Sequence, residues 1–323
     1  MVYQLIDTEG ALRSALNRLK GHPNEPPSYY IDTEGHKLGR SGTLDLLQLH
    51  VLPLQETLVI DIYTLQQKAF NTSSQGLSLK MLLESSSIAK VFFDVRSDSD
   101  ALFSHYEILL EGVVDLQMME YFQPGRGGRH LRGLKDCITQ DSGLMPEEIQ
   151  DWSLTKDSVV ESFSTVATPQ NYLSQLRPLP DILLTYSVGD VKHLPHLYEI
   201  YRQCLSKQVW NLVRKESQKR LQQSRQSAYD PDSKRKWKGP FRLTNFASSN
   251  SRTQKNDGTK SKTKKGSQSH DGRNSSQVTE KELSPADTAL PTRLPLRTQD
   301  LKLSGASSRA PNEEVCLSSN LAS

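Results

Sequence analysis

The chain has 323 residues, of which 35% are hydrophobic and 24% charged, and its net charge is +3. No stretch reaches the ~18 consecutive apolar residues that a membrane span needs, and the first residues lack the basic and apolar regions of a signal peptide. The three cysteines, at unrelated spacings, form no metal-finger pattern. These features exclude membrane-spanning and disulfide-rich secreted classes, so we expect an intracellular protein of the nucleus or the cytoplasm.

Acidic and basic residues are unevenly distributed along the chain. Residues 207–323 hold 23 Lys and Arg against 11 Asp and Glu, a charge of +12, which leaves −9 for residues 1–206. An acidic domain repels a polyanion unless cations bind to it, whereas a basic segment attracts phosphates. The distribution favours metal ions and nucleic acid as partners, although a solvated acidic surface with a disordered tail would produce the same charges.

The first predicted elements are one helix and three strands. Leucines at helical spacing predict a helix over residues 11–19, with Asp7 or Thr8 as its N-cap. Runs rich in apolar and β-branched residues then predict strands at residues 28–32, 44–51 and 56–62. Three strands in succession predict an antiparallel meander.

Strands and helices alternate in the next part of the chain. The patterns predict a helix at residues 78–84, a strand at 90–95, a helix at 99–108, a strand at 113–116, a helix at 131–138 and one long helix at 183–204. We therefore expect an α/β fold in which a mixed sheet is flanked by helices.

A change in composition divides the chain into three predicted regions. Apolar runs support one folded domain over residues 1–206, followed by a basic helical extension over 207–239. Residues 240–323 are rich in Ser, Lys, Arg, Asn, Gln and Thr, and we expect a disordered basic C-terminal tail there. The basic clusters Lys234–Lys238 and Lys260–Lys265 fit nuclear-import segments, nucleic-acid contacts or solvated linker equally well.

Asp32 and Glu34 form the first candidate site. They stand two residues apart at the end of a predicted strand, so both side chains project from the same face of the sheet. Two carboxylates this close resist joint ionisation unless a cation shares them, and hard divalent ions take such oxygen ligands. The same tripeptide occurs at residues 7–9, but there it opens a helix, where acids favour the positive end of the helix dipole.

Asp98 is the second candidate. It begins a predicted helix just after the strand at 90–95, which directs its carboxylate toward the same edge of the sheet. An ordinary helix N-cap is the alternative. Asp94 and Asp100 flank Asp98 and are the alternative candidates for the carboxylate at this edge of the sheet.

Tyr186 and Asp190 form the third candidate. Their i, i+4 spacing on a predicted helix places a phenol and a carboxylate on one face, one turn apart. Such a spacing arises often by chance, so alone it does not predict a site.

The order of these pieces resembles the DEDD superfamily of 3′→5′ exonucleases, in its tyrosine subclass. The similarity extends over residues 2–206 and is greatest to ribonuclease D-like members, among them fungal and Egalitarian-like exonuclease domains. Its motifs are Ile31–Gly35, Lys90–Leu102 and Tyr186–Asp190, with Val114–Gln117 similar to the segment after the second motif. The sequence departs from the pattern at Phe93, where many relatives have His, in a longer connection at residues 139–170, and in the lack of a following HRDC-type domain.

The resemblance implies a ribonuclease H-like fold and hydrolysis with two divalent metal ions, Mg²⁺ or Mn²⁺. It implies that Asp32 bridges both ions, Glu34 and Asp190 complete one shell, Asp98 serves the other ion, and Tyr186 orients the attacking water. The partner would be the 3′ end of a single-stranded nucleic acid, with RNA favoured over DNA, and nucleoside 5′-monophosphates would be released. Some Egalitarian-like relatives have lost acids and only bind RNA, so an inactive RNA-binding module on the same fold is the alternative. The oligomeric state stays open.

A glycine-rich basic stretch, Gly125–Arg132, lies inside the acidic domain. We predict that Arg126, Arg129 and Arg132 contact phosphates, with a bland surface loop as the alternative. The nearby aromatic residues either stack on a terminal base or pack in the core; these are Tyr121, Phe122 and Tyr172.

Overall fold

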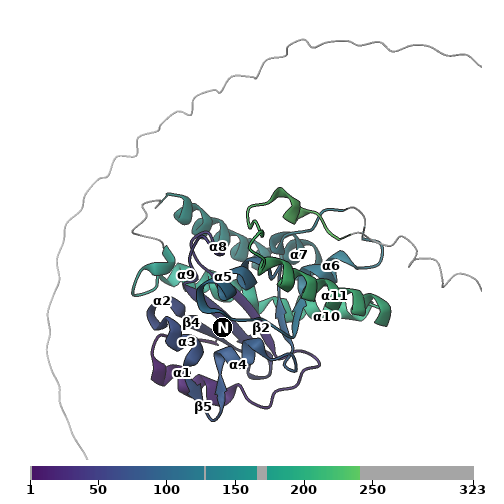
Figure 1. Ribbon diagram of the computed structural model, residues 1–323. Coiled ribbons are helices and arrows are strands. Elements are labelled where there is room, and N and C mark those ends of the chain that lie inside the picture. Colours follow the sequence, from purple (N-terminus) through teal and green to yellow (C-terminus); the bar gives the residue numbers. More distant parts are fainter. Residues whose placement is uncertain (1, 127–128, 166–172, 241–323) are drawn as a thin grey trace, which may run out of the picture. The chain divides into compact units, whose positions relative to one another are not determined.

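The folded part of the chain is built around a mixed sheet (Figure 1). This sheet has six strands in the order β1-β4-β3-β2-β7-β8. The computed structural model describes residues 2–126, 129–165 and 173–240. The strands are β1 Val2–Ile6, β2 Tyr29–Glu34, β3 Leu46–Val51, β4 Glu56–Asp61, β7 Lys90–Phe92 and β8 Val113–Asp115, and a small hairpin adds β5 Ser73–Ser74 and β6 Leu77–Ser78. The strands β2, β3 and β4 pair antiparallel, which confirms the predicted meander, while β1, β7 and β8 join in parallel.

Helices cover both faces of this sheet, as predicted for an α/β fold. They are α1 Glu9–Arg18, α2 Ile62–Leu65, α3 Gln67–Asn71, α4 Leu79–Glu84, α5 Arg96–Tyr106, α6 Leu116–Tyr121, α7 Leu134–Asp141, α8 Pro146–Thr165, α9 Asp181–Lys192, α10 Leu194–Cys204 and α11 Lys207–Ser224, with 3₁₀ turns η1 Leu52–Leu54, η2 Leu173–Gln175 and η3 Lys234–Trp237. Apolar side chains of α1, α3, α4 and α5 share one core cluster with the sheet, and those of α9 pack on its opposite face. None of the helices in the described ranges is long and apolar enough to cross a membrane.

The first helix confirms its sequence prediction. The Thr8 side chain accepts a hydrogen bond from the amide of Ala11, which satisfies one of the free N–H groups of the first turn. Leu12, Ala15 and Leu16 are buried on one face. The edge strand β1 was not predicted, because its partner β4 lies some fifty residues further along the chain, with Val2 opposite Glu56.

The prediction of one long helix over residues 183–204 is wrong. The chain forms two helices, α9 and α10, which meet at His193. Pro195, in the first turn of α10, has no amide hydrogen, and its ring clashes with the carbonyl four residues earlier in a continuous helix. The helix at residues 146–165 was not predicted, and the helix expected at 131–138 begins later, at Leu134.

The helix α11 begins anew after Ser206 and completes the core on the β8 side of the sheet. The Ser217 hydroxyl accepts a hydrogen bond of 2.9 Å from the amide of Asp115 in β8, and the hydroxyls of Ser224 and Ser99 lie 2.9 Å apart. Leu221 is fully buried in the core cluster that contains α5. The basic extension is therefore packed against the sheet through residue 224 and beyond. The predicted disordered tail, apart from Pro240, and Tyr172 lie outside the described residues.

A buried ion pair holds α11 to β8, and we expect its loss to destabilise the protein. The Arg220 guanidinium lies 2.6 Å from the Asp115 carboxylate, with side-chain exposures of 7% and 0%. Arg220→Ala leaves a buried carboxylate without its cation, which costs about 3 kcal/mol of unfolding free energy. Urea denaturation measures this change. The control is Lys219→Ala, whose side chain is 51% exposed; equal midpoints for the two variants would show that α11 does not depend on this pair.

Candidate active site

Asp32 and Glu34 lie at the end of β2, on the face of the sheet that α9 covers. The strand is held between β3 and β7, and its alternation places Thr33 on the opposite face. The chain leaves the strand at Gly35, where an added Cβ would lie 2.1 Å from the carbonyl oxygen of Thr43. A side chain has no room there, so glycine permits the close turn that follows the acidic pair.

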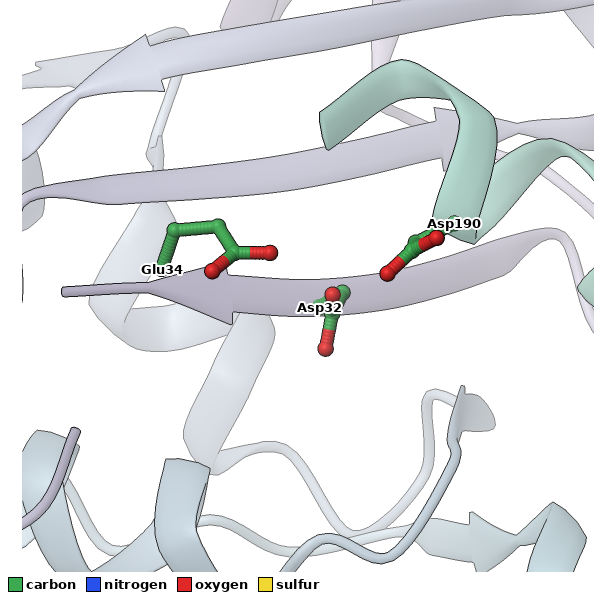
Figure 2. A group of neighbouring side chains, drawn as sticks. All are labelled: Asp32, Glu34 and Asp190. Carbon is green, nitrogen blue, oxygen red and sulfur yellow. The ribbon is translucent and has the colours of Figure 1, made fainter. Parts of the chain in front are cut away.

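Asp190 completes a group of three carboxylates. It lies on α9, with an exposed fraction of 3%, and α9 packs across β2, β3 and β4. One carboxylate oxygen from each of Asp32, Glu34 and Asp190 lies within 4.8 Å of the other two. In Figure 2 the carboxyl groups of Glu34 and Asp190 point toward each other along β2, with Asp32 between them. The structure thus brings together two sequence motifs that are more than 150 residues apart.

Burial raises the pKa of each of these acids, and repulsion by neighbouring carboxylates adds to the rise for Asp32 and Glu34. Burial, followed by the charge of Asp190, raises the pKa of Glu34 to about 8. Burial and the charges of Glu34 and Asp98 raise the pKa of Asp32 well above its ordinary value. The pKa of Asp190 also rises through burial. Carboxylates this close resist joint ionisation unless positive charge lies among them, and an all-oxygen ligand set suits Mg²⁺ or Mn²⁺.

Asp98 lies beside this group and not within it. Its carboxylate accepts a hydrogen bond of 2.8 Å from the Thr33 hydroxyl, on the side of β2 that α5 covers. Burial raises the pKa of Asp98 to about 7. The two alternative candidates have guanidinium partners, since Asp94 pairs with Arg96 at 2.5 Å and Asp100 with Arg40 at 2.8 Å. Within the described residues Asp98 has no such partner, which favours it over its neighbours.

The Tyr186 side chain faces the carboxylates. It stands one turn before Asp190 on α9, and hydrogen bonds from its hydroxyl offset part of the rise that burial causes in the pKa of Glu34 and of Asp190. Burial and these nearby acids raise the pKa of Tyr186 itself, so the phenol keeps its proton. The i, i+4 spacing in the sequence therefore places both side chains on the face of α9 that is turned to Asp32 and Glu34.

Two residues of α8 belong to the site and were not predicted. The Lys156 ammonium donates to one carboxylate oxygen of Asp190, and the Trp152 indole N–H donates to the other at 3.2 Å. Lys156 also lies 4.8 Å from the centre of the Tyr186 ring. An added Cβ on Gly189 would lie 3.1 Å from the Trp152 ring, so glycine allows this close approach. The i, i+4 spacing of Trp152 and Lys156 would have revealed the pair, had the helix itself been predicted.

The arginines of the Gly125–Arg132 stretch are partly engaged within the protein. Arg126 pairs with the buried Glu120, and Arg132 lies 3.5 Å from Glu120 and 3.2 Å from Asp141. Arg129 is exposed. Their role in phosphate contact stays a prediction. Of the neighbouring aromatic residues, Tyr121 is 1% exposed and packs in the core beside Phe122.

Residues 3–206 match the sequence model of a 3′-5′ exonuclease family. The fold is similar to the solved structure of Trypanosoma brucei RNase D, at 24% identity and a TM-score of 0.57 over 69% of this chain and 73% of that one. The complex of Trypanosoma brucei RNase D with RNA U12 has 23% identity and a TM-score of 0.55, over 73% of this chain and 77% of that one. Its GMP complex has 21% identity and a TM-score of 0.56, over 75% of this chain and 74% of that one. No curated protein matches the chain. The predicted ribonuclease H-like exonuclease fold is therefore confirmed.

The raised pKa values make the stability of the metal-free protein depend on pH. A carboxyl group whose pKa is higher in the folded state binds its proton more tightly there, so its contribution is present at low pH and is lost as the pH rises through the folded value. For Glu34 the window runs from 4.5 to about 8. We expect the free energy of unfolding, measured in a chelator, to fall across this window. Glu34→Gln should flatten the profile, whereas Glu9→Gln, in the exposed copy of the tripeptide, should not. A level wild-type profile would contradict the geometry.

Lys156 should compete with a divalent ion for Asp190. Its ammonium binds a carboxylate oxygen that such an ion would use. Like charges about 5 Å apart repel by several kcal/mol at an effective dielectric constant of about 20. Lys156→Gln is therefore expected to tighten Mn²⁺ binding at least about tenfold by calorimetry. Lys192→Gln, at an exposed position of α9, provides the control. Weaker binding in the Lys156 variant would mean that the lysine orients Asp190 for the ion.

Proposed function

The chain belongs to the 3′-5′ exonuclease family, and on that premise we propose that it removes nucleotides from the 3′ end of single-stranded RNA with two divalent ions, Mg²⁺ or Mn²⁺. One observation carries the proposal, the meeting of Asp32, Glu34 and Asp190 within 4.8 Å. The burial of Asp190 and the raised pKa values of all three acids fit a site that is completed by divalent cations.

Each acidic residue has a proposed role. Asp32, Glu34 and Asp190 would hold one ion, and Asp98, whose charge acts on Asp32, would share the second with Asp32. When bound, paired ions supply stabilisation of the attacking and leaving oxygens of a phosphodiester. Tyr186, hydrogen-bonded to Glu34 and protonated at neutral pH, is the group that would orient the attacking water. Attack on the terminal phosphodiester releases a nucleoside 5′-monophosphate and leaves a new 3′ hydroxyl.

The preference for RNA rests on the fold comparison. Backbone hydrolysis requires only a phosphate and metal ions, so the acidic group alone does not distinguish RNA from DNA. Trypanosoma brucei RNase D, with a similar fold, has been solved with RNA U12 and with GMP. These complexes support RNA as substrate and a nucleoside monophosphate as product. We expect matched RNA and DNA strands to be shortened at different rates, with RNA the faster.

A module that binds RNA without cutting it is the second candidate. The contact of Lys156 with Asp190 favours it, because the lysine supplies a positive charge at the position where a metal ion would act. Incubation of the wild-type protein with 5′-labelled RNA and DNA strands in Mn²⁺ or Mg²⁺ separates the two. Binding without any shortening would support the module and contradict the enzyme.

The duplicated tripeptide provides a matched test of the active site. Asp32→Asn removes a carboxylate from the acidic group, and we expect cleavage of single-stranded RNA to fall by at least about 10²–10³-fold, the effect of losing one electrostatic stabiliser. Asp7→Asn makes the same change in the exposed copy, which opens α1, and should leave the rate unchanged. Product ladders from 5′-labelled RNA provide the measurement. Equal activity of Asp32→Asn and wild type would place the chemistry elsewhere.

A further inference from the structure

The segment Ser233–Pro240 lies beyond the part of the chain that matches the family, yet it is fixed against the active-site domain. Its η3 turn presents Trp237, a large apolar side chain that is 61% exposed. The exposed residues Arg235 and Lys238 lie on either side of it. An exposed indole between cations is a combination that binds single-stranded nucleic acid, because bases stack on the ring while the cations contact phosphates.

The backbone of this segment forms a short antiparallel pairing with the loop that follows Arg129. His130 and Lys238 form a bridge, the amide of Leu131 donates to the carbonyl of Trp237 at 3.0 Å, and the amide of Gly239 donates to the carbonyl of Arg129 at 2.7 Å. These bonds join two basic stretches that are far apart in the sequence. Backbone groups provide the attachment, so the side chains of Arg129, Arg235 and Lys238 stay exposed.

The close packing of Gly239 fixes the position of the segment further. An added Cβ on Gly239 would lie 2.2 Å from the ring of Tyr121, so only glycine allows the chain to lie on this ring. The Tyr121 hydroxyl donates to the carbonyl of Pro240 at 2.7 Å. The exposed aromatic residue and its cations are thus held on an ordered platform, which lowers the entropy cost of binding.

A cavity of about 420 Å³ lies beside this segment and is strongly basic. Two acids, Glu216 and Asp230, line it against six cations, which are Arg96, Lys219, Arg220, Arg235, Lys236 and Lys238. Salt bridges with acids engage Arg96, Lys219 and Arg220. In the described part of the chain no acid pairs with Arg235 or Lys238, which leaves their charges available to a polyanion.

The segment also reaches the edge of the active site. The Lys236 ammonium lies 3.0 Å from the hydroxyl of Ser97, the residue before Asp98, and the Lys236 carbonyl accepts a hydrogen bond of 3.1 Å from Arg96. The charge of Asp98 acts on Lys236. The segment therefore contacts Arg96 and Ser97, the two residues that precede Asp98 in α5.

We propose that Ser233–Pro240, together with the loop at Arg129–Leu131, forms a binding subsite for the single-stranded RNA upstream of the cleaved nucleotide. Trp237 stacks on a base, and Arg235, Lys238 and Arg129 contact phosphates. This inference rests on the proposed nucleic-acid substrate and adds a region outside the family match. An import receptor is disfavoured as the occupant, because it would compete with the backbone pairing that holds the segment in place.

RNA binding by Trp237 variants tests the subsite. The full chain in an Asp32→Asn background keeps the strand intact, and fluorescence anisotropy with a labelled oligouridylate of about 12 nucleotides gives the affinity. Trp237→Ala should weaken binding about 5- to 150-fold, the range for loss of one base–aromatic stack. Trp237→Phe should retain most of the affinity. Stacking should also quench the tryptophan fluorescence of the Trp237-containing protein, and this quench should be absent in the phenylalanine variant.

The cations are tested by salt dependence. Each phosphate contact contributes about 0.7 to the slope of log affinity against log salt for a single strand, so Arg235→Ala/Lys238→Ala should lower the slope by about 1.4. Lys207→Ala/Lys215→Ala removes the same charge from exposed positions of α11 and should not change it.

Equal RNA affinities for the Asp32→Asn protein with and without Trp237→Ala would overturn the proposed subsite. Binding of an import receptor to the segment would not rescue the proposal in that case. If wild-type protein cleaves no strand while RNA binding still depends on Trp237, only the proposed exonuclease function fails.

Discussion

The structure depends on the repulsion between carboxylates that the fold forces together. Asp32 and Glu34 lie at the end of a central strand, and the packing of α9 on the same face brings Asp190 to them. The backbone position of Asp190 relative to the other two is set by the packing of α9 on the sheet. Burial makes their charges expensive, as the raised pKa of each shows. The folded state therefore binds a proton or a cation at these carboxylates, at the end of β2.

Lys156 supplies part of this positive charge from within the chain. Its ammonium binds Asp190, while Trp152 of the same helix donates to the other oxygen and packs on Gly189. The position of α8 and the charge of the site are consequently linked. A divalent ion that takes the place of the ammonium must also change what holds α8 against α9, so metal binding and the placement of this helix cannot be independent.

Local patterns predicted the meander, α1 and the acidic pair, because strand alternation and a helix cap act over a few residues. Spacing on one helix likewise predicted that Tyr186 and Asp190 share a face. The break at His193 was missed although Pro195 marks it, since apolar residues continue on both sides. Lys156 and the bridge between His130 and Lys238 depend on contacts between distant segments, which no local pattern encodes. The order of motifs identified the family, whereas the place of Asp98 beside the other acids required the structure.

The packing of residues 207–240 on the acidic domain gives a structural reason for the opposite charges of residues 1–206 and 207–323. An acidic domain alone would repel the phosphates that its active site must approach. The first part of the basic half is fixed at that site by α11 and by backbone bonds to Arg129 and Leu131. Neutral groups, serine hydroxyls and peptide bonds, make many of these attachments, although Arg220 contributes a buried ion pair. Because the anchoring does not consume the charges of Arg235 and Lys238, positive charge remains on the exposed surface of this segment, where it offsets the repulsion between the acidic domain and a polyanion.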